Sequence, residues 1–550
     1  MTTSPPTEET ESKKTEPTAA VGADALPDAS ALEDKMPEWF RSPWPFLLFT
    51  AVCGVCFFWY NNAMTIYHTD IWSHITYGEL IYNAKAIPAT EPLMPLSAGM
   101  RFVDTAWLSQ VLTYKLFAWQ GVAGLKFFHG FCVTLTVGLL IGLMYRRTKN
   151  VPMILIGLLF FFWVERIQFQ IVRPQLTGLV CFTVLFLLLA SRRWTGWHFA
   201  ATTVLFACWA NLHGSFVVGL ALIAACCAGS WVDVLRRTDK ISAAFSGTKF
   251  RRFLALAELA FIGTLLNPYG LAIYGDVLTF SNNLNLADIL DWEALTIRSA
   301  QGQAMAFVAL MLLLVYRMTP RRISCAELFQ LVGLGVAALW TSRFIVWWGP
   351  VAAYYFVLHG SAIWYKSRGG VQSLEPLERK SLWTVSALGL AFIFFAITSF
   401  GLAVMHGEHG DFKQSVSAST PVDAVEHMLK DHAAGKLPAG QIFNTFEWGD
   451  YLLWKGHKQG FQVFAASHVH LVPREVWRDY LTASQLGNGW RDLLDRYSVN
   501  VVLIDTARHR GLVEALKNDT NWEQSYPPRN IQEHNAREKN EYVFYRIKPL

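Results

Sequence analysis

The sequence predicts an α-helical polytopic membrane protein with a small α/β domain at its C-terminal end. Of its 550 residues, 53% are hydrophobic, 14% are aromatic and only 16% are charged, which is more apolar than a water-soluble enzyme allows. Apolar runs that reach or approach the length of a bilayer-crossing helix recur along the chain. Lys and Arg collect in every second segment between these runs, as expected of a chain that crosses a membrane repeatedly.

The apolar runs predict about eleven transmembrane helices, because a helix needs about 20 residues to cross a hydrocarbon core of about 30 Å. They lie near residues 44–60, 123–145, 151–164, 175–191, 197–212, 215–234, 252–267, 303–316, 325–341, 344–360 and 383–405. Before the second run, apolar residues recur at helical spacing over 107–119. We expect this stretch to form an amphipathic helix on the membrane interface.

Basic residues set the predicted orientation, because Lys and Arg favour the cytoplasmic side. Their clusters lie at residues 146–149, 192–193, 236–252, 317–322 and 366–380. The N-terminus is then cytoplasmic, and the segment after the last helix lies outside the inner (cytoplasmic) membrane. The net charge of +5 is spread over these loops and the C-terminal segment. It therefore predicts membrane lipids as partners and no nucleic acid.

Three parts follow one another along the chain. Residues 1–43 are rich in Thr, Pro, Ala, Glu and Asp, and we expect a disordered cytoplasmic tail because such a segment cannot build a core. Residues 44–406 form the transmembrane bundle, with a first outer loop at 61–106. Residues 407–550 form a soluble extracytoplasmic domain without cysteine, so no disulfide holds it together.

The C-terminal domain mixes two periodicities. Residues 422–429 have helical spacing, residues 501–505 indicate a buried strand, and residues 542–545 indicate a last strand. This mixture is typical of an α/β fold.

Polar motifs collect at the bundle face opposite the basic loops. The residues concerned are Asp70, His74, Arg173, Asn211, His213, Asn267, Asp291 and Arg343. Polar side chains at membrane depth are costly unless they line a wet cavity or the bundle interior. The pattern therefore predicts chemistry at the outer face.

The first outer loop carries three candidate carboxylates. Asp70 comes just after the first membrane helix, four residues before His74, and Glu91 and Asp104 follow in the same loop. An ionised carboxylate can remove a proton from an alcohol. We predict Asp70 as this base; a helix cap or a structural hydrogen bond is the alternative.

Two arginines and one histidine are candidate partners for a phosphate group. Arg173 begins the fourth apolar run and Arg343 the tenth, and the planar guanidinium suits phosphate oxygens. Arginines that extend to the membrane interface are the alternative. His213 can bind phosphate, ligate a metal or carry a proton, and a structural use stays open.

The further candidates for binding the substrate or its phosphate, His74, Asn211, Asn267 and Tyr269, have less specific signals. Asn267 and Tyr269 lie in an Asn-Pro-Tyr-Gly segment that by itself indicates a turn. His68 and His74 could share an ion. The sequence contains no P-loop, no dinucleotide fingerprint, no H-E-x-x-H and no G-x-S-x-G, so nucleotide hydrolysis and zinc proteolysis lose their support.

Together these motifs resemble the bacterial integral-membrane glycosyltransferase-like proteins of the GT-C superfamily. The matching residues are Asp70, Trp72, His74, Gly78, Pro88, Trp107, Leu108, Arg173, Pro174, Gln175, Trp209, Asn211, His213, Gly214, the segment 267–270 and Arg343, with the segments 444–449 and 451–452 in the outer domain. The resemblance spans residues 44–550.

The resemblance implies transfer of a sugar from a polyprenyl-phosphate carrier, with a carboxylate of the first outer loop as base. That role falls to Asp70, with Asp104 or Glu91 as replacements, because the best-studied branches carry two adjacent acids where Ile71 follows Asp70 here. The acceptor is a glycan, a protein or a lipid, and a divalent metal ion is a possible cofactor. The group's outer domain often carries an Asp-Gly-Arg-like segment where residues 466–468 read Ala-Ser-His, so no role is carried over to it.

The expected reaction is a single inverting displacement, with Asp70 as base and Arg173, Arg343 or His213 facing the leaving phosphate. A multi-helix transporter or flippase is one alternative. A non-catalytic envelope scaffold with a glycan-binding outer domain is the other. Its aromatic side chains for stacking would be Trp448, Tyr451, Trp477 and Trp490.

Overall fold

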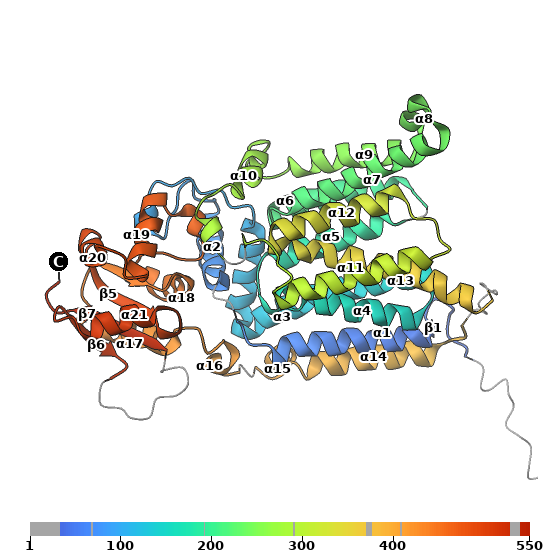
Figure 1. Ribbon diagram of the computed structural model, residues 1–550. Helices are drawn as coiled ribbons and strands as arrows, with labels where there is room; N and C mark the ends of the chain where they lie inside the picture. The colour runs from blue at the N-terminus through green and yellow to red at the C-terminus, as the bar shows by residue number, and fades with distance from the viewer. Residues whose placement is uncertain are drawn as a thin grey trace, which may run out of the picture.

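A helical bundle and an α/β domain lie end to end in the computed structural model, which describes residues 34–67, 70–191, 193–289, 292–369, 377–407, 410–528 and 540–549. In Figure 1 the domain, in orange and red, lies to the left of the bundle. The helix α2 lies between the two.

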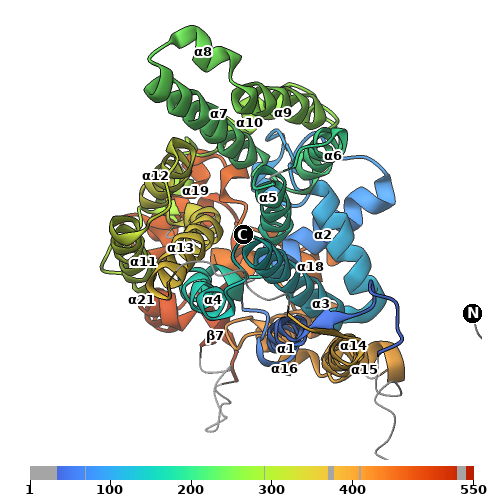
Figure 2. The ribbon, with the colours of Figure 1, turned by 90° about the vertical axis from the view of Figure 1, so that its right-hand side faces the viewer.

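Each predicted apolar run coincides with one helix, or in the last case with two. The helices of the first part are α1 (Trp44–Phe58), α2 (Asp70–Ala84), α3 (Trp107–Thr148), α4 (Val151–Glu165), α5 (Gln175–Leu189), α6 (Gly196–Leu212), α7 (Phe216–Thr238), α8 (Ile241–Ser246), α9 (Thr248–Thr264), α10 (Ala272–Phe280), α11 (Ala300–Met318), α12 (Cys325–Trp340), α13 (Ile345–Ser367), α14 (Ser381–Ala396) and α15 (Ser399–His406). Residues 345–361 of α13 are all buried, and this helix lies inside the bundle when viewed end-on (Figure 2).

Four helices are long and apolar enough to cross a membrane, counted over the described residues. They are Trp44–Ala63, Trp107–Thr148, Phe216–Thr238 and Ala300–Met318, and α14 with α15 makes a fifth if the pair, bent by 83°, counts as one span. The chain thus has the helices of an integral membrane protein. The count of about eleven spans and the orientation stay predictions.

The helix α3 joins the predicted amphipathic stretch to the second apolar run. Gln120 and Gly121 interrupt its helical backbone, and Gly121 has φ of +56°, a conformation that glycine adopts without steric cost. Residues 107–119 are therefore helical, as predicted. Their position on a membrane interface stays a prediction.

The region 61–106 is not simply a loop, because it contains α2. Ile71, Trp72 and Ile75 of this helix are buried. A Cβ at Gly78 would lie 2.2 Å from the carbonyl oxygen of Gln110, so glycine allows α2 to approach α3 closely. This contact helps to position Asp70, the first residue of α2, between the bundle and the α/β domain (Figure 1).

The C-terminal domain is a mixed sheet with helices. Its strands are β3 (Gln441–Asn444), β4 (Gln462–Val463), β5 (Val499–Asp505), β6 (Trp522–Tyr526) and β7 (Glu541–Arg546), and its helices are α16 (Phe412–Ser415), α17 (Val422–Ala433), α18 (Phe446–Gly456), α19 (Arg474–Ser484), α20 (Trp490–Arg496) and α21 (Thr506–Lys517). The strand order is β4-β3-β5-β7-β6. The strand β3 is parallel to β4 and β5, and β7 is antiparallel to β5 and β6. All three predicted elements of this domain are confirmed.

The folded part begins before residue 44. The two-residue strands β1 (Ser42–Pro43) and β2 (Arg379–Lys380) pair antiparallel, and the Asp34 side chain accepts a hydrogen bond from the Ser381 amide. The predicted tail is therefore ordered from residue 34. Residues 1–33 lie outside the described residues.

An aromatic cluster attaches the α/β domain to α2. Trp72 stacks on Trp454 with ring centroids 4.4 Å apart, and Tyr451 and Phe412 pack against Trp72 at 5.5 and 5.6 Å. The tryptophan rings are tilted by only 23° to each other. This buried contact holds the domain in place over Asp70.

Candidate active site

Asp70 and Arg173 form an ion pair at the junction of the two parts. Arg173 precedes α5, and its Nε lies 2.7 Å from Oδ2 of Asp70. The side chains are 8% exposed for Arg173 and 13% exposed for Asp70. The guanidinium thus compensates the carboxylate charge where little water is present.

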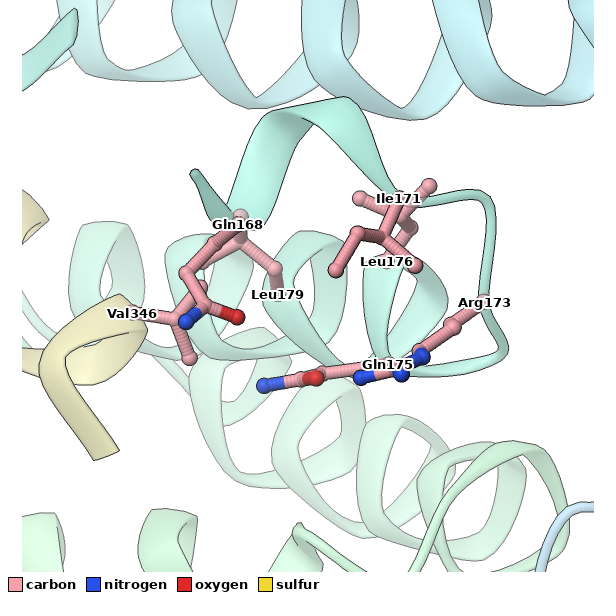
Figure 3. Close-up of a pocket in the computed structure, with 7 residues that line it drawn as sticks. All are labelled: Gln168, Ile171, Arg173, Gln175, Leu176, Leu179 and Val346. Atoms are coloured by element: carbon pink, nitrogen blue, oxygen red, sulfur yellow. The ribbon is translucent and has the colours of Figure 1, made fainter. Parts of the chain in front are cut away.

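The space on the apolar side of Arg173 is small. A cavity of about 10 Å³ is lined by Gln168, Ile171, Arg173, Gln175, Leu176, Leu179 and Val346. Figure 3 shows Arg173 and Gln175 along one edge of this cavity. It has room for about one water molecule, so this cavity does not hold a sugar or a lipid tail.

A hydrogen-bonded chain links two predicted site residues in the first outer region. The amide nitrogen of Gln110 lies 3.2 Å from Nδ1 of His74 and donates to Oδ1 of Asp104, also at 3.2 Å. Burial raises the pKa of Asp104 to about 7, opposed by the hydrogen bond from the Ala106 amide. Asp104 therefore holds a proton more readily than an ordinary carboxyl and positions His74 through Gln110.

Glu91 is used as a structural acceptor. Its Oε2 accepts a hydrogen bond from the Tyr77 hydroxyl at 2.8 Å, and its Oε1 accepts from the Leu93 and Met94 amides. Burial raises its pKa despite these bonds. These contacts close the loop after α2 and favour a structural role over that of a replacement base.

The α/β domain brings further side chains to Asp70. Ser73 Oγ donates to the Asp70 carbonyl oxygen and lies 3.3 Å from Nδ1 of His468. Ser467 donates to the Asp450 carboxyl through both its hydroxyl and its amide. Burial, and next the Asp70 carboxylate, raise the pKa of Asp450. The segment 466–468, to which no role was carried over from the resemblance, thus lies near Asp70. We call the group of Asp70, His74, Arg173, Arg343, Asp450, His468 and His470 the Asp70 cluster.

Three histidines from two regions lie ring to ring. The His468 ring is 5.3 Å from His74 and 5.7 Å from His470, measured between centroids. Burial lowers the pKa of His468 to about 4 and that of His470 to about 3, and it also lowers that of His74. All three rings are uncharged at neutral pH, and the three residues are half-buried. They can donate or accept hydrogen bonds without adding charge.

Arg343 supplies the second cation of the cluster. Its guanidinium lies 5.0 Å from the ring centroid of Trp292, where a cation–π contact orients it. Arg343 is close enough to lower the pKa values of His213 and His470. Both predicted arginines therefore lie at this junction.

Three other predicted residues, Asn211, Asn267 and Tyr269, form hydrogen bonds with backbone or indole groups. Asn211 accepts from the Trp107 indole and donates to the Ala207 and Leu266 carbonyls. Asn267 bonds within its own turn, and the Tyr269 hydroxyl accepts from the Asp104 amide. They position the loops around the cluster.

A loop of the bundle clamps the segment that carries the two domain histidines. The Asn285 amide donates to the Val469 and Val472 carbonyls, each at 2.8 Å. Arg474 pairs with Asp288 at 2.7 Å, and Asn283 donates to the His470 carbonyl. His468, His470 and Asp450 have no local signal in the sequence, because contacts between distant segments bring them to this junction.

The four aromatic residues named as possible glycan-stacking surfaces, for which a core position was the alternative, are core residues. Trp448, Tyr451, Trp477 and Trp490 are all buried. These rings therefore offer no open stacking face, and the scaffold alternative loses its proposed binding surface.

Two predicted residues, His68 and Asp291, lie outside the described residues. Within the described ranges, no three His, Cys, Asp or Glu side chains are arranged to hold a metal ion. A divalent metal ion as cofactor stays a prediction.

No family model and no curated protein matches the chain. Among solved structures, the chain is similar to the Archaeoglobus fulgidus oligosaccharyltransferase tethered to an acceptor peptide, with a TM-score of 0.51 and 13% identity over 89% of this chain and 74% of that one. The same enzyme with zinc and sulfate gives 0.49 and 14% over 84% and 68%. ArnT from Cupriavidus metallidurans bound to undecaprenyl phosphate gives 0.48 and 12% over 90% and 97%. At the level of the fold, the resemblance to the GT-C glycosyltransferases is confirmed.

Proposed function

We propose that this protein is a membrane glycosyltransferase that moves a sugar from a polyprenyl-phosphate donor to an acceptor at the bundle end that carries the α/β domain. The observation that carries the proposal is the buried Asp70–Arg173 pair, surrounded by a second arginine and uncharged histidines. A carboxylate can act as the base, and arginines can stabilise a leaving phosphate. Uncharged histidines can hydrogen-bond to the sugar, so this set of side chains suits a displacement at a sugar carbon.

Asp70 acts as the base in this proposal. The acceptor hydroxyl gives its proton to Asp70 while its oxygen forms a bond to the anomeric carbon. The bond from that carbon to the phosphate oxygen breaks, and its electron pair leaves with the phosphate. One displacement inverts the anomeric configuration.

The two arginines stabilise the leaving phosphate. A guanidinium has five N–H donors, so Arg173 can hold Asp70 and a phosphate oxygen together. Arg343 is oriented by Trp292 and needs little reorganisation when negative charge develops. The uncharged rings of His468 and His470 hold sugar hydroxyls without competing for that charge.

Asp450 complements Asp70 as a second acid. Two neighbouring carboxyls do not both carry charge easily, and Asp450 is the buried member whose pKa is raised. In its protonated form Asp450 carries no charge, so no second negative charge then lies beside Asp70.

The fold relative with a tethered acceptor peptide supports a macromolecular acceptor as one option. A glycan and a lipid stay the other two options. The outer face and the inner membrane are the predicted setting.

A transfer assay tests the proposal. The full chain in lipid nanodiscs is incubated with a panel of polyprenyl-phosphate sugars and with peptide, glycan and lipid acceptors. We expect release of polyprenyl phosphate with one donor and a product of inverted configuration. Retention of configuration would contradict the single displacement, and absence of turnover with every donor would contradict the function.

A further inference from the structure

A second site lies in the α/β domain, apart from the Asp70 cluster. A cavity of about 350 Å³ is lined by Phe446, Tyr480, Leu481, Ser484, Gln485, Leu486, Arg508, His509, Arg510, Gly511 and Leu512. Phe446 follows β3, residues 508–512 belong to the helix that follows β5, and the others come from the end of α19 and the segment after it. None of these residues takes part in the proposed transfer.

The cavity lies where open α/β sheets form ligand sites. The strands β3 and β5 are parallel neighbours. From β3 the chain continues to β4 on one side, whereas from β5 it continues to β6 and β7 on the other side. The carboxyl ends of two such strands leave a crevice between their diverging connections. Phe446 and the first turns of α21 border this crevice.

The charge of the lining favours an anion. The lining contains two arginines and no Asp or Glu. Arg508 forms ion pairs with Glu447 and Asp505, which balance its charge. Arg510 is exposed and forms no ion pair with any described residue. Its guanidinium is thus available to a ligand.

The histidine of the cavity adds no charge. His509 interrupts the helical backbone of α21, with φ of −127° and ψ of 43°. Burial, and then Arg508, lower its pKa. The uncompensated positive charge of the lining therefore comes from Arg510, whose guanidinium keeps it at every ordinary pH.

The floor of the cavity is apolar. Phe446 and Tyr480 meet edge to face at 6.4 Å, and Leu481, Leu486 and Leu512 lie beside them. Ser484 and Gln485 add polar groups. A volume near the lower end of the roughly 300–1,000 Å³ found for small-molecule sites suits a ligand of monosaccharide size.

We propose that this cavity binds a small organic anion of monosaccharide size, with its phosphate or carboxylate on Arg510 and Arg508 and its body on Phe446. The proposal does not depend on the transferase activity. The guanidinium groups can bind either a phosphate or a carboxylate group of the ligand.

Calorimetric titration of the full chain in nanodiscs tests this site. The probes are glucose 1-phosphate, glucuronate, inorganic phosphate and glucose. We expect at least one sugar anion to bind saturably, about tenfold or more tightly than glucose. The relative affinities of glucose 1-phosphate and glucuronate identify the preferred anionic group.

Two variants locate the binding. Arg510→Gln removes one charge without breaking an ion pair, and Gln485→Trp fills the cavity without changing charge; each should weaken binding about tenfold. The matched control is Arg478→Gln, an exposed arginine of α19 outside the lining, which should leave affinity unchanged. Binding of glucose or inorganic phosphate as tight as that of both sugar anions overturns the proposal. So does binding unaffected by Arg510→Gln, or no saturable binding of either anion.

Discussion

Two buried acid–base groups lie at opposite ends of the bundle, and they differ in what surrounds them. At the end remote from the α/β domain, His359 Nε2 lies 2.8 Å from Glu327 and its Nδ1 lies 3.1 Å from the Thr319 hydroxyl. Ser324 donates to the other Glu327 oxygen, and His359 is fully buried. At the Asp70 end, by contrast, His74, His468 and His470 are only half-buried.

The difference separates a structural network from a candidate site. The Glu327–His359 group is satisfied within α12, α13 and the residues between α11 and α12, so it holds helices together. The Asp70 cluster joins the bundle to a second domain and contains uncharged histidines that are only half-buried. The same residue types therefore serve packing at one end and, by our proposal, chemistry at the other.

Apart from loss of the base Asp70, the largest effect on this comparison is expected from Arg343→Gln. Loss of a preorganised cation opposite the leaving phosphate should slow transfer about 100-fold, and the rate is compared per folded molecule because the variant also loses the contact with Trp292. Initial rates and thermal unfolding are measured together. An unchanged rate would remove Arg343 from the site.

His468→Ala tests whether the α/β domain completes the cluster. Loss of one hydrogen-bonding ring should slow transfer about tenfold, the equivalent of about 1.4 kcal/mol. The control is His427→Ala, a histidine of the same domain that bonds to Ser525. If His468→Ala transfers sugar as fast as His427→Ala, His468 takes no part in the reaction.

His359→Ala tests the structural end. It leaves Glu327 buried without its partner and should destabilise the protein by about 1–3 kcal/mol, measured as a lower unfolding temperature in nanodiscs. The transfer rate per folded molecule should stay at the wild-type value. A slower rate in fully folded protein would mean that this pair also serves the reaction.

The smallest effect is the pH dependence of stability from His468. Its pKa is lowered from 6.5 to about 4, so the unfolded chain takes up a proton first, and stability falls as pH drops from about 6.5 towards 4. Asp104, with its raised pKa, acts in the opposite direction, so the comparison is between wild type and His468→Gln. The unfolding temperature of the wild type should fall about 1–2 °C more between pH 7 and pH 5. An identical fall would show that folding does not lower the pKa of His468.

Much of the bundle could be predicted because hydrophobic length is a local signal. The apolar runs mark the helices, and alternation of basic loops brings Asp70, Arg173 and Arg343 to one end. The helix α2 was missed because its buried face packs against another domain, so it lacks the apolar run of a membrane helix.

The contribution of the α/β domain could not be predicted from local pattern. His468 reaches Ser73 across 395 residues of sequence, through a clamp formed by Asn285 and Asp288. Those side chains look like ordinary loop residues in the sequence. Likewise, Glu91 looked like a candidate base until the Tyr77 hydroxyl and two amides were seen to occupy its oxygens.

The most direct test of the central claim is the initial transfer rate of Asp70→Asn in nanodiscs, compared with Asp104→Asn and with a control, Asp276→Asn. Asp276 pairs with Arg101 at the same end of the bundle, outside the cluster. We predict a loss of about 10²–10⁴-fold for Asp70→Asn, a smaller loss for Asp104→Asn and none for the control. Wild-type turnover by Asp70→Asn would contradict the assignment of the base and of the site built around it.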